Sequence, residues 1–492
     1  MLSGLDEKAE SMKKPKANRP NIVLIVTDQW RGDCLGLQGH PTLDTPNLDH
    51  VFRNGTMFSR AYSSVPSCIA ARAALLTGLS QETHGRVGYQ DRVQWNYPVT
   101  LPGELAKAGY QTHCVGKMHV FPARQLMGFH SVDLCDGYTH NERCRDEDYG
   151  LVDDYLPYLR RHAGAEADLT DAGVGCNGYS VSPWPYEERC HPTNWVTTKS
   201  VDFLRRRDST KPFFLKVSYH RPHPPLDPPL PWLERYMGRT LPPRVVGDWA
   251  ADRPLRAGHG EDSPAPTSEA QIELARRAYL AQLTHIDCQI NRLIHALVER
   301  RLMQDTLLMF VSDHGDMLYD HNLLAKATGY DASARIPFLV RLPDAWKQPQ
   351  TGETEAPVEL RDVMPTLLEA AGAAIPAGVE GRSVLPLCRG EEPAWRADLH
   401  GEHSRGKMSN HWMTDGREMY IWYSQTGEEQ LFDLRTDLRN ERNVAPSCSE
   451  RVAYWRARLV ETLTGREEGY VADGKLVVGR TPLAVLADAG QG

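Results

Sequence analysis

The sequence predicts an α/β protein, with a doubly wound, mostly parallel sheet and a smaller C-terminal α+β subdomain. Short apolar runs such as Ile22–Val26 alternate with helical segments over the first 120 residues, which is the pattern of βαβ units. Two more apolar runs flank a long helical segment further along the chain. Beyond an Ala-, Gly- and Pro-rich stretch at residues 372–378, short strand-like segments and one final helical pattern indicate the smaller subdomain.

Each element of the main domain rests on a local pattern. The run Ile22–Val26 is typical of a strand buried on both faces of a parallel sheet. Further strands are predicted at Gln111–Val115, Pro212–Tyr219 and Thr306–Val311. The segment Glu269–Met303 has apolar residues every three or four positions, which predicts a core-packed helix without a catalytic role. Shorter helices are predicted at Ala70–Leu76 and at Leu101–Ala108, with Gly109 as a C-cap.

The composition shifts along the chain predict its organisation. We expect a flexible tail at residues 1–18, a main catalytic domain at 19–375 and a C-terminal subdomain at 376–492. Irregular segments at 131–195 and 247–268 interrupt the main domain, and the second has the Pro, Gly and charge content of a surface loop or lid. In the subdomain, antiparallel strands are predicted at Glu418–Tyr423 and Glu429–Asp433, a closing helix at Ser449–Leu463, and frayed residues at the end of the chain.

Composition and charge exclude several classes of protein. The 492 residues are 41% hydrophobic and 24% charged, as in ordinary globular chains. The net charge of −8 gives no basic field, so we expect neither nucleic acid nor a membrane as a partner. The longest apolar stretch, Asn21–Val26, is far shorter than the ~20 residues of a membrane helix. The first 20 residues lack the apolar core of a secretion signal, which predicts a cytoplasmic protein with reduced cysteines.

Three metal-ligand side chains follow two of the predicted strands. Asp28 comes after the run Ile22–Val26, and Asp313 and His314 come after Thr306–Val311. Because ligands bind at the carboxyl ends of strands in open parallel sheets, we expect these side chains to converge. Carboxylate oxygens suit Ca²⁺, Mg²⁺ or Mn²⁺, and the imidazole favours Mn²⁺ over an all-oxygen site. The alternative is that each Asp merely caps the next turn.

A cysteine begins the predicted helix at residues 70–76. Pro66 stops the helix from extending backwards, so Cys68 lies close to its N-terminus, where a thiol pKa falls and an anion is attracted. Arg72 lies one turn further on the same face and can reach back to Cys68. Taken alone, such a Cys–Arg pair is more often structural than functional.

Seven sequence blocks, in order, resemble the type I, formylglycine-dependent sulfatase family of the alkaline phosphatase superfamily. The family's cysteine signature is matched by Cys68-x-x-x-Arg72 followed by Leu76-Thr77-Gly78. The other blocks are Pro20–Asp28, Thr45–Asp49, Gly116-Lys117-Met118-His119, Arg221-Pro222-His223-Pro224-Pro225, Ser312–Asp316 with Lys326, Tyr330 and Arg335–Pro337, and Leu431–Asp433 with Asp437 and Asn440. Together they span about residues 19 to 445, nearly the whole chain.

This resemblance implies an alkaline-phosphatase-like fold and a sulfuric ester hydrolase of the arylsulfatase type. It implies that a formylglycine-generating enzyme oxidises Cys68 to formylglycine (3-oxoalanine), whose hydrate attacks sulfur. It also implies one divalent metal ion, with calcium favoured and manganese as the alternative. The implied metal ligands are Asp28, Gln29, Cys68, Asp313 and His314. The implied catalytic residues are Cys68, Arg72, Lys117, His119, His223 and Lys326.

Each implied role has a physical reason. Arg72 and Lys117 would steady the hydrated aldehyde, and His119 would be the base that expels sulfate. His223 and Lys326 would face the transferring oxygens, and one of them would protonate the leaving alcohol. His220 is a rival to His223 three residues earlier in the chain. Positioned cations of this kind stabilise the charge that develops in the transition state.

Three departures from the family pattern bear on the chemistry. Ala70-Ala71 stands where the common signature has Pro-Ser, which puts the efficiency of cysteine conversion in question. Gln29 stands where many members have Asp, and His314 where many have Asn, as in choline sulfatases and phosphonate monoester hydrolases. Gln29 either ligates through its amide oxygen or takes no part. The lower negative charge admits Mn²⁺ beside Ca²⁺.

The sequence leaves function and substrate partly open. The leading hypothesis is hydrolysis of an aryl or sugar sulfate; the alternatives are a phosphonate monoester or phosphodiester hydrolase with the same nucleophile, and a non-catalytic binding protein in which Cys68 stays a thiol. The side chains of Trp184, Tyr186, His191 and Trp195 either stack on a substrate ring or, as we favour, pack beneath a loop. A further expectation is that Asp136, Arg143 and Arg145 line the entrance.

Overall fold

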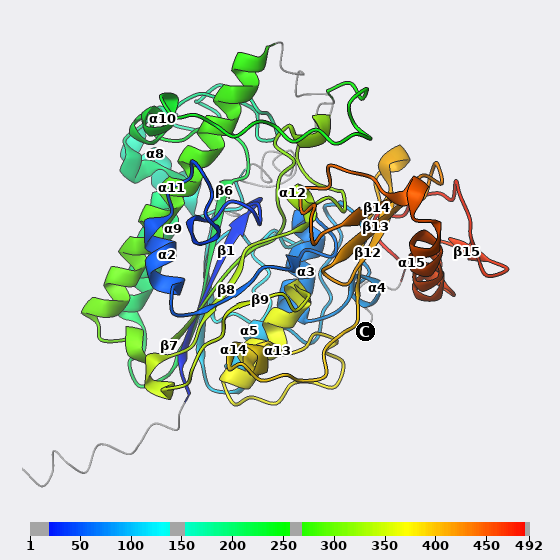
Figure 1. Ribbon diagram of the computed structural model, residues 1–492. Helices are drawn as coiled ribbons and strands as arrows, with labels where there is room; N and C mark the ends of the chain where they lie inside the picture. Colours follow the sequence, from blue (N-terminus) through cyan, green and yellow to red (C-terminus); the bar gives the residue numbers. More distant parts are fainter. Residues whose placement is uncertain (1–18, 138–152, 256–267, 488–492) are drawn as a thin grey trace, which may run out of the picture.

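An eight-stranded sheet forms the centre of the protein, and a smaller sheet stands beside it (Figure 1). A computed structural model describes residues 19–137, 153–255 and 268–487. The strand order of the main sheet is β5-β4-β6-β1-β7-β8-β2-β9. Its strands are β1 (Asn21–Asp28), β2 (Thr56–Phe58), β4 (Gln111–Gly116), β5 (Ser131–Leu134), β6 (Phe213–Pro222), β7 (Thr306–Ser312), β8 (Phe338–Arg341) and β9 (Gly352–Thr354). Only the pairings of β8 with β7 and with β2 are antiparallel among those described, so the predicted α/β class is confirmed.

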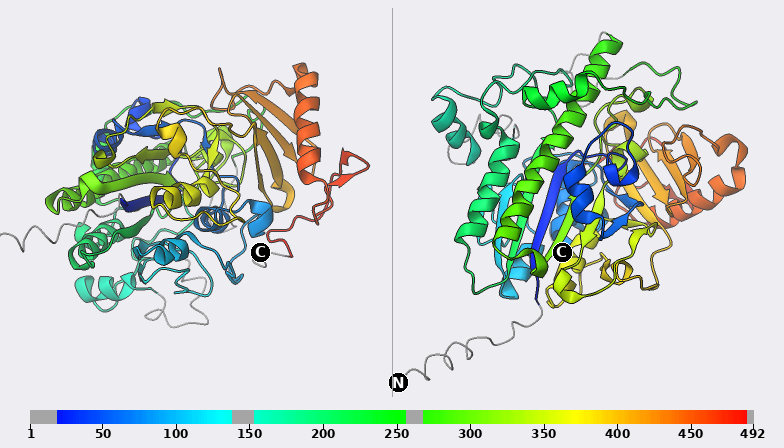
Figure 2. Two further views of the ribbon diagram at one scale, coloured as in Figure 1. Left: turned by 90° about the horizontal axis from the view of Figure 1, so that it is seen from below. Right: turned by 60° about the vertical axis from the view of Figure 1, so that its left-hand side comes forward.

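Helices cover both faces of this sheet (Figure 2). The longer described helices of the main domain are α2 (Pro46–Phe52), α3 (Cys68–Thr77), α5 (Leu101–Lys107), α8 (Tyr155–Ala163), α9 (Pro192–Arg206), α10 (Leu230–Met237), α11 (Glu269–Glu299) and α13 (Val363–Ala370). Side chains of β1 alternate between two cores: Val23 and Ile25 belong to the core under α9 and α11, whereas Leu24 and Val26 belong to the core under α3, α5 and α13. This alternation explains why β1 is apolar at every position from Ile22 to Val26.

The predicted elements agree with the structure within a few residues, with one clear exception. The long helix was expected to reach Met303, but α11 ends at Glu299. Arg301 then adopts a left-handed backbone with φ of 56°, and Met303–Asp305 form a separate 3₁₀ turn that leads into β7. The apolar pattern continues through Leu302 and Met303 because both side chains pack against the same core.

The C-terminal subdomain is a four-stranded antiparallel sheet closed by a helix, as predicted. The strands are β11 (Leu399–His403), β12 (Asn410–Thr414), β13 (Glu418–Tyr423) and β14 (Glu429–Asp433), and the helix is α15 (Ser449–Leu463). On one face of the sheet, Trp412 belongs to a hydrophobic cluster with Tyr62 and Tyr330 of the main domain. On the other face, Trp422 belongs to a cluster with Trp455 of α15. The domain limit at residues 375 and 376 stays a prediction.

The described parts of the irregular segment at 131–195 contribute to the core rather than to a substrate platform. Trp184, His191 and Trp195 are buried, and Tyr186 is partly buried at the edge of the same cluster. The favoured alternative, that these rings pack within the protein, is therefore confirmed for Trp184, His191 and Trp195. Arg143 and Arg145, the tail at 1–18 and most of the expected lid lie outside the described residues. None of the helices in the described ranges is both long and apolar enough to span a bilayer.

Candidate active site

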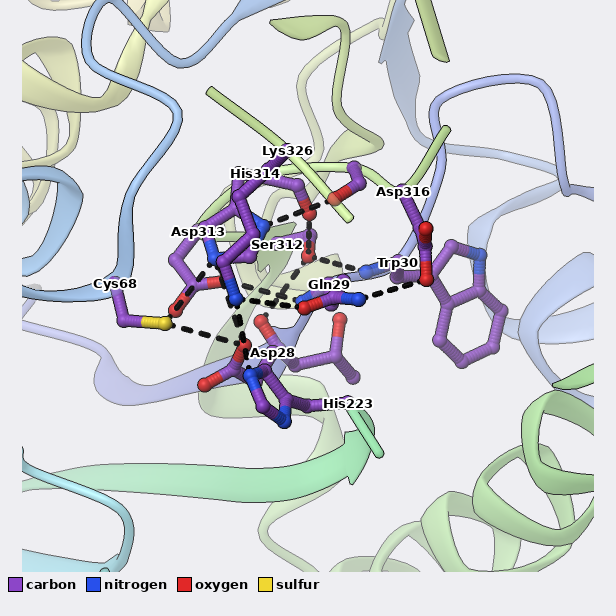
Figure 3. Close-up of polar contacts among 12 residues, drawn as sticks. Asp28, Gln29, Trp30, Cys68, His223, Ser312, Asp313, His314, Asp316 and Lys326 are labelled. Atoms are coloured by element: carbon purple, nitrogen blue, oxygen red, sulfur yellow. Dashed lines mark hydrogen bonds and ion pairs between the residues drawn. The ribbon is translucent and has the colours of Figure 1, made fainter. Parts of the chain in front are cut away.

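Two neighbouring strands bring the predicted metal ligands together. Because β1 pairs with β7 in parallel, with Thr27 opposite Ser312, the residues that follow these positions meet at one edge of the sheet. Asp28 ends β1, and Asp313 and His314 follow β7. The N-terminus of α3 adds Cys68 to the same place, as Figure 3 shows.

The four side chains form a tight, buried cluster. The sulfur of Cys68 lies 3.2 Å from His314 Nε2 and 3.7 Å from Asp28 Oδ1. His314 Nε2 also lies 3.6 Å from Asp28 Oδ1 and 3.7 Å from Asp313 Oδ1. One ligand atom from each residue lies within 4.8 Å of all the others. The sequence placed Asp28 and Asp313 at one edge of the sheet, and the structure does the same.

The chemistry of this cluster fits a divalent metal ion. His314 Nδ1 lies 2.9 Å from the carbonyl oxygen of Gly315, to which it donates in the neutral ring. That hydrogen bond leaves the Nε2 lone pair facing the two carboxylates, as in histidines that bind metals. Oxygen and nitrogen donors of this kind suit Ca²⁺ or Mn²⁺.

Two cations neutralise the carboxylates. Lys117 Nζ lies 2.5 Å from Asp28 Oδ2, and Arg72 Nη2 lies 2.9 Å from Asp313 Oδ2. Burial alone would raise the pKa of Asp28, but Lys117, His223, His314 and Arg72 together hold this pKa well below its usual value. Arg72 was expected to reach back to Cys68; its described hydrogen bonds instead go to Asp28, Asp313, the Lys117 carbonyl and Ser218.

The Cys68 thiol lies in a cationic environment. Burial and the charge of Asp28 raise its pKa, while Lys117, Lys326 and His314 lower it. The cations prevail, so the pKa of Cys68 lies below that of an ordinary thiol. The sequence predicted this direction from the helix N-terminus, but the structure adds charged side chains from three other segments.

His223 and Lys326 form a buried pair beside the cluster. Lys326 Nζ lies 3.0 Å from His223 Nε2, and His223 Nδ1 lies 2.8 Å from the Pro224 carbonyl oxygen. Since a carbonyl only accepts, Nδ1 carries the ring hydrogen and Nε2 accepts from Lys326. Burial is the main reason why the pKa of His223 lies well below its usual value, and Lys326 adds to the shift. The rival His220 bonds to Arg221 instead.

His119 lies two residues after Lys117 on the loop that follows β4. Its backbone is left-handed, with φ of 58°, and its ring packs edge-on against Tyr89 with centroids 6.2 Å apart. Asp136 accepts hydrogen bonds from the backbone N–H groups of Met118 and His119 at 2.7 and 3.0 Å. The expectation that Asp136 lines an entrance is therefore wrong, because its buried carboxylate braces this loop from within.

Three residues near the cluster were not predicted. Asp316 and Tyr179 bond to the Gln29 side chain. Neither ring nitrogen of buried His403, at the end of β11, has a partner among the described residues, and burial with the charges of Arg405, His314 and Lys326 lowers the pKa of His403 to about 3. Asp316 belongs to the block Ser312–Asp316 and so carried a signal, whereas Tyr179 lies in an irregular segment that carried none.

A second group of metal-ligand side chains occurs in the C-terminal subdomain. His400 Nε2 lies 3.3 Å from His411 Nδ1, and Glu402 Oε2 lies 3.7 Å from the latter atom. Arg466, however, already binds both oxygens of Glu402, at 2.7 and 2.9 Å. Gln81 donates to His400 Nδ1, which leaves the Nε2–H of His400 to donate to His411. This group is therefore satisfied by its own hydrogen bonds.

Comparisons with known proteins agree with this geometry. The sulfatase family model matches residues 20–373, and a model described as N-sulphoglucosamine sulphohydrolase, C-terminal, matches residues 319–465. An arylsulfatase of Clostridium perfringens is 46% identical over 471 residues, which cover 94% of this chain and 98% of the relative. The multifunctional alkaline phosphatase superfamily protein PehA of Trinickia caryophylli is 32% identical over 428 residues, which cover 78% of this chain and 80% of the relative.

A solved structure shows the same fold. The phosphonate monoester hydrolase of Agrobacterium radiobacter superposes with a TM-score of 0.74 at 24% identity, over 90% of this chain and 95% of the other. The chain therefore belongs to the sulfatase family, as an enzyme of the arylsulfatase type.

Proposed function

We propose that this protein hydrolyses sulfate esters with a formylglycine made from Cys68. The observation that carries the proposal is the position of Cys68, the first residue of α3, 3.2 Å from His314 and 3.7 Å from Asp28 in a buried cluster. The similarity to a bacterial arylsulfatase supports an aryl sulfate as substrate, and a sugar sulfate is the alternative.

Residues Asp28, Asp313, His314 and the converted Cys68 would hold one divalent ion. When bound, this ion would supply a positive charge that stabilises an oxygen nucleophile at neutral pH. Calcium remains the favoured metal and manganese the alternative. Gln29 is proposed as a further ligand through the second lone pair of its amide oxygen, because Lys326 Nζ already donates to that oxygen at 2.8 Å.

The cations of the site have separate roles in this proposal. Arg72 and Lys117 would hold the hydrated aldehyde in place, because both are buried and fixed by the carboxylates of Asp313 and Asp28. His223 and Lys326 would bind the transferring sulfate oxygens. Since Lys326 carries the proton that it shares with His223 Nε2, this pair can supply a proton to the leaving alcohol.

His119 is proposed as the base that takes a proton from the second hydroxyl of the hydrate when sulfate is expelled. Its place on the Lys117 loop supports this role, because the bonds from Asp136 fix the loop. Expulsion of sulfate would regenerate the aldehyde for the next turnover.

A phosphonate monoester or phosphodiester hydrolase is the second candidate. Gln29 and His314 support it, because these are the positions at which the chain departs from the common sulfatase pattern. The relative PehA, described as multifunctional, supports it as well.

Mass spectrometry of the peptide around Cys68, with purified native protein, tests the proposal directly. We expect the mass of formylglycine; an unmodified thiol in active protein would overturn the mechanism, and in inactive protein would favour a binding role. Turnover of 4-nitrophenyl sulfate and of an aryl phosphonate monoester then separates the two reactions. The Cys68→Ala variant is the control and should be inactive on both.

A further inference from the structure

Backbone contacts alone hold Gln29 in one position. It has a left-handed conformation with φ of 74°, which is unfavourable for a residue with a Cβ atom. Its N–H donates to Asp313 Oδ1 at 3.1 Å, and its carbonyl accepts from the Tyr279 hydroxyl at 2.8 Å. These contacts place residue 29 beside the metal cluster in a single orientation.

The side-chain amide of Gln29 is fixed as well. Its nitrogen donates to Asp316 Oδ2 at 2.7 Å and lies 3.1 Å from the Tyr179 hydroxyl. Its oxygen accepts from Lys326 Nζ at 2.8 Å, as Figure 3 shows. Both hydrogens of the amide and its oxygen are therefore engaged, and reversing the amide would set Lys326 against an N–H group and Asp316 against an oxygen.

Asp316 and Tyr179 are themselves oriented for this contact. The Tyr179 hydroxyl lies 2.8 and 2.9 Å from the two oxygens of Asp316, to which it donates its hydrogen. The backbone N–H groups of Leu318 and Ala325 donate to Asp316 Oδ1 and to the Tyr179 hydroxyl, respectively. Asp316 is fully buried and Tyr179 nearly so.

We infer that Asp316 and Tyr179 are positioning residues that hold the Gln29 amide with its oxygen towards Lys326 and the metal cluster. Position 29 then offers a neutral acceptor at the reaction centre, while the negative charge lies one side chain further out, on Asp316. This inference rests on the proposed function for its catalytic consequence, because Lys326 is held between Gln29 and His223.

Exchange of the amide and the carboxylate tests this inference. Gln29→Glu sets two buried carboxylates against each other, and we expect a lower thermal unfolding midpoint and a loss of about 10- to 100-fold in kcat on 4-nitrophenyl sulfate. Adding Asp316→Asn restores a donor opposite the carboxylate introduced at position 29. The double variant should therefore recover at least tenfold in kcat and most of the unfolding midpoint.

The metal itself gives a readout that is independent of turnover. Ca²⁺ or Mn²⁺ should raise the thermal unfolding midpoint of the unaltered protein in a concentration-dependent way. At a given metal concentration, we expect this rise to be at least threefold smaller in Tyr179→Phe. Tyr186→Phe is the matched control, because it removes a Tyr–Asp hydrogen bond from the same segment at a more exposed position. It should leave metal stabilisation unchanged.

Two results would overturn the inference. One is a Tyr179→Phe variant that responds to metal like the unaltered protein. The other is a double variant in which Asp316→Asn lowers kcat and the unfolding midpoint further than Gln29→Glu alone. If the protein fails to turn over any sulfate ester, the proposed function fails, but the metal titration and the unfolding midpoints of the exchange still test the positions of Asp316 and Tyr179.

Discussion

At the scale of single residues, the site depends on charge held in a small buried volume. Among its groups Arg72, Lys117 and Lys326 are cationic, while Asp28 and Asp313 are anionic. Lys326 bonds to the uncharged side chains of Gln29 and His223, so its positive charge suits a substrate with an anionic sulfate group. In surroundings with little water, each such charge contributes more than it would at the surface.

Replacement of Lys117 by Met should lower kcat on 4-nitrophenyl sulfate by ~10²- to 10³-fold, because one positioned cation is lost next to Asp28. The exposed Lys107, which pairs with Glu104 at the surface, supplies the control. Lys107→Met should keep full activity and an unchanged unfolding midpoint. Equal loss in both variants would show that the effect is not local to the site.

At the scale of elements, the ends of strands and helices place the reactive groups. The turn after β4 requires Gly116, whose φ is +95° and where a Cβ atom would overlap the carbonyl oxygen of Ser218. This close approach of β4 and β6 brings Lys117 to the cluster, because the Lys117 N–H donates to that carbonyl at 3.0 Å.

Gly116→Ala should therefore destabilise the protein by about 3 kcal/mol and reduce activity with it. Gly109 also has a positive φ, +87°, but a Cβ atom there meets nothing within 4 Å. Gly109→Ala should cost only about 1 kcal/mol and leave kcat unchanged. Urea unfolding of both variants, with kcat measured in parallel, checks the difference.

The histidine that caps the N-terminus of α9 should make the stability of the protein depend on pH. His191 caps this helix, since its Nδ1 accepts from the Thr193 N–H at 3.1 Å. Burial is the main cause that lowers the pKa of His191 to about 4, against the opposing effect of Asp227. The folded protein keeps this ring neutral. The contribution of His191 to the free energy of unfolding is therefore fully present above pH 6.5 and is lost as the pH drops towards 4.

His191→Asn keeps a good capping side chain and removes the titration. Between about pH 7.5 and 5.0 the unaltered protein should lose about 2 kcal/mol of stability through His191, and the variant should not. Urea unfolding at the two pH values measures this. An equal loss in both proteins would mean that other groups cause the acid sensitivity.

Much of the main domain and the site could be predicted because strand ends and helix starts are local patterns. Asp28, Cys68 and Asp313 each follow or begin an element with a clear signal. Tyr179 and His403 could not be found in this way. Their contacts depend on how an irregular segment and a second sheet fold back over the cluster, and no periodicity encodes that approach.

At the scale of the whole molecule, the C-terminal subdomain completes the main domain. Trp412 of β12 packs against Tyr62, with ring centroids 5.8 Å apart, and its ring leaves no space for a Cβ atom at Gly329 or Gly401. This docking positions β11 so that His403 lies close to His314 and Lys326, whose charges help to lower the pKa of His403.

Trp412→Ala should destabilise the protein by about 3–5 kcal/mol, through the cavity that it leaves, and should reduce kcat even where the protein remains folded. The exposed Tyr454 on α15 serves as the control, since Tyr454→Ala removes an aromatic ring without a cavity. Thermal unfolding and kcat of the two variants should diverge. A folded, fully active Trp412→Ala variant would contradict a role for the docking.

The burial of Cys68, at 2% exposure, has a consequence for the oxidation that we propose at this side chain. An enzyme that oxidises this side chain needs room around it, and the finished molecule leaves none. The two strands that enclose the sulfur are separated by most of the synthesis of the chain, since β7 is made long after β1. If Cys68 is converted to formylglycine as proposed, the conversion would have to precede the docking of β7 onto β1.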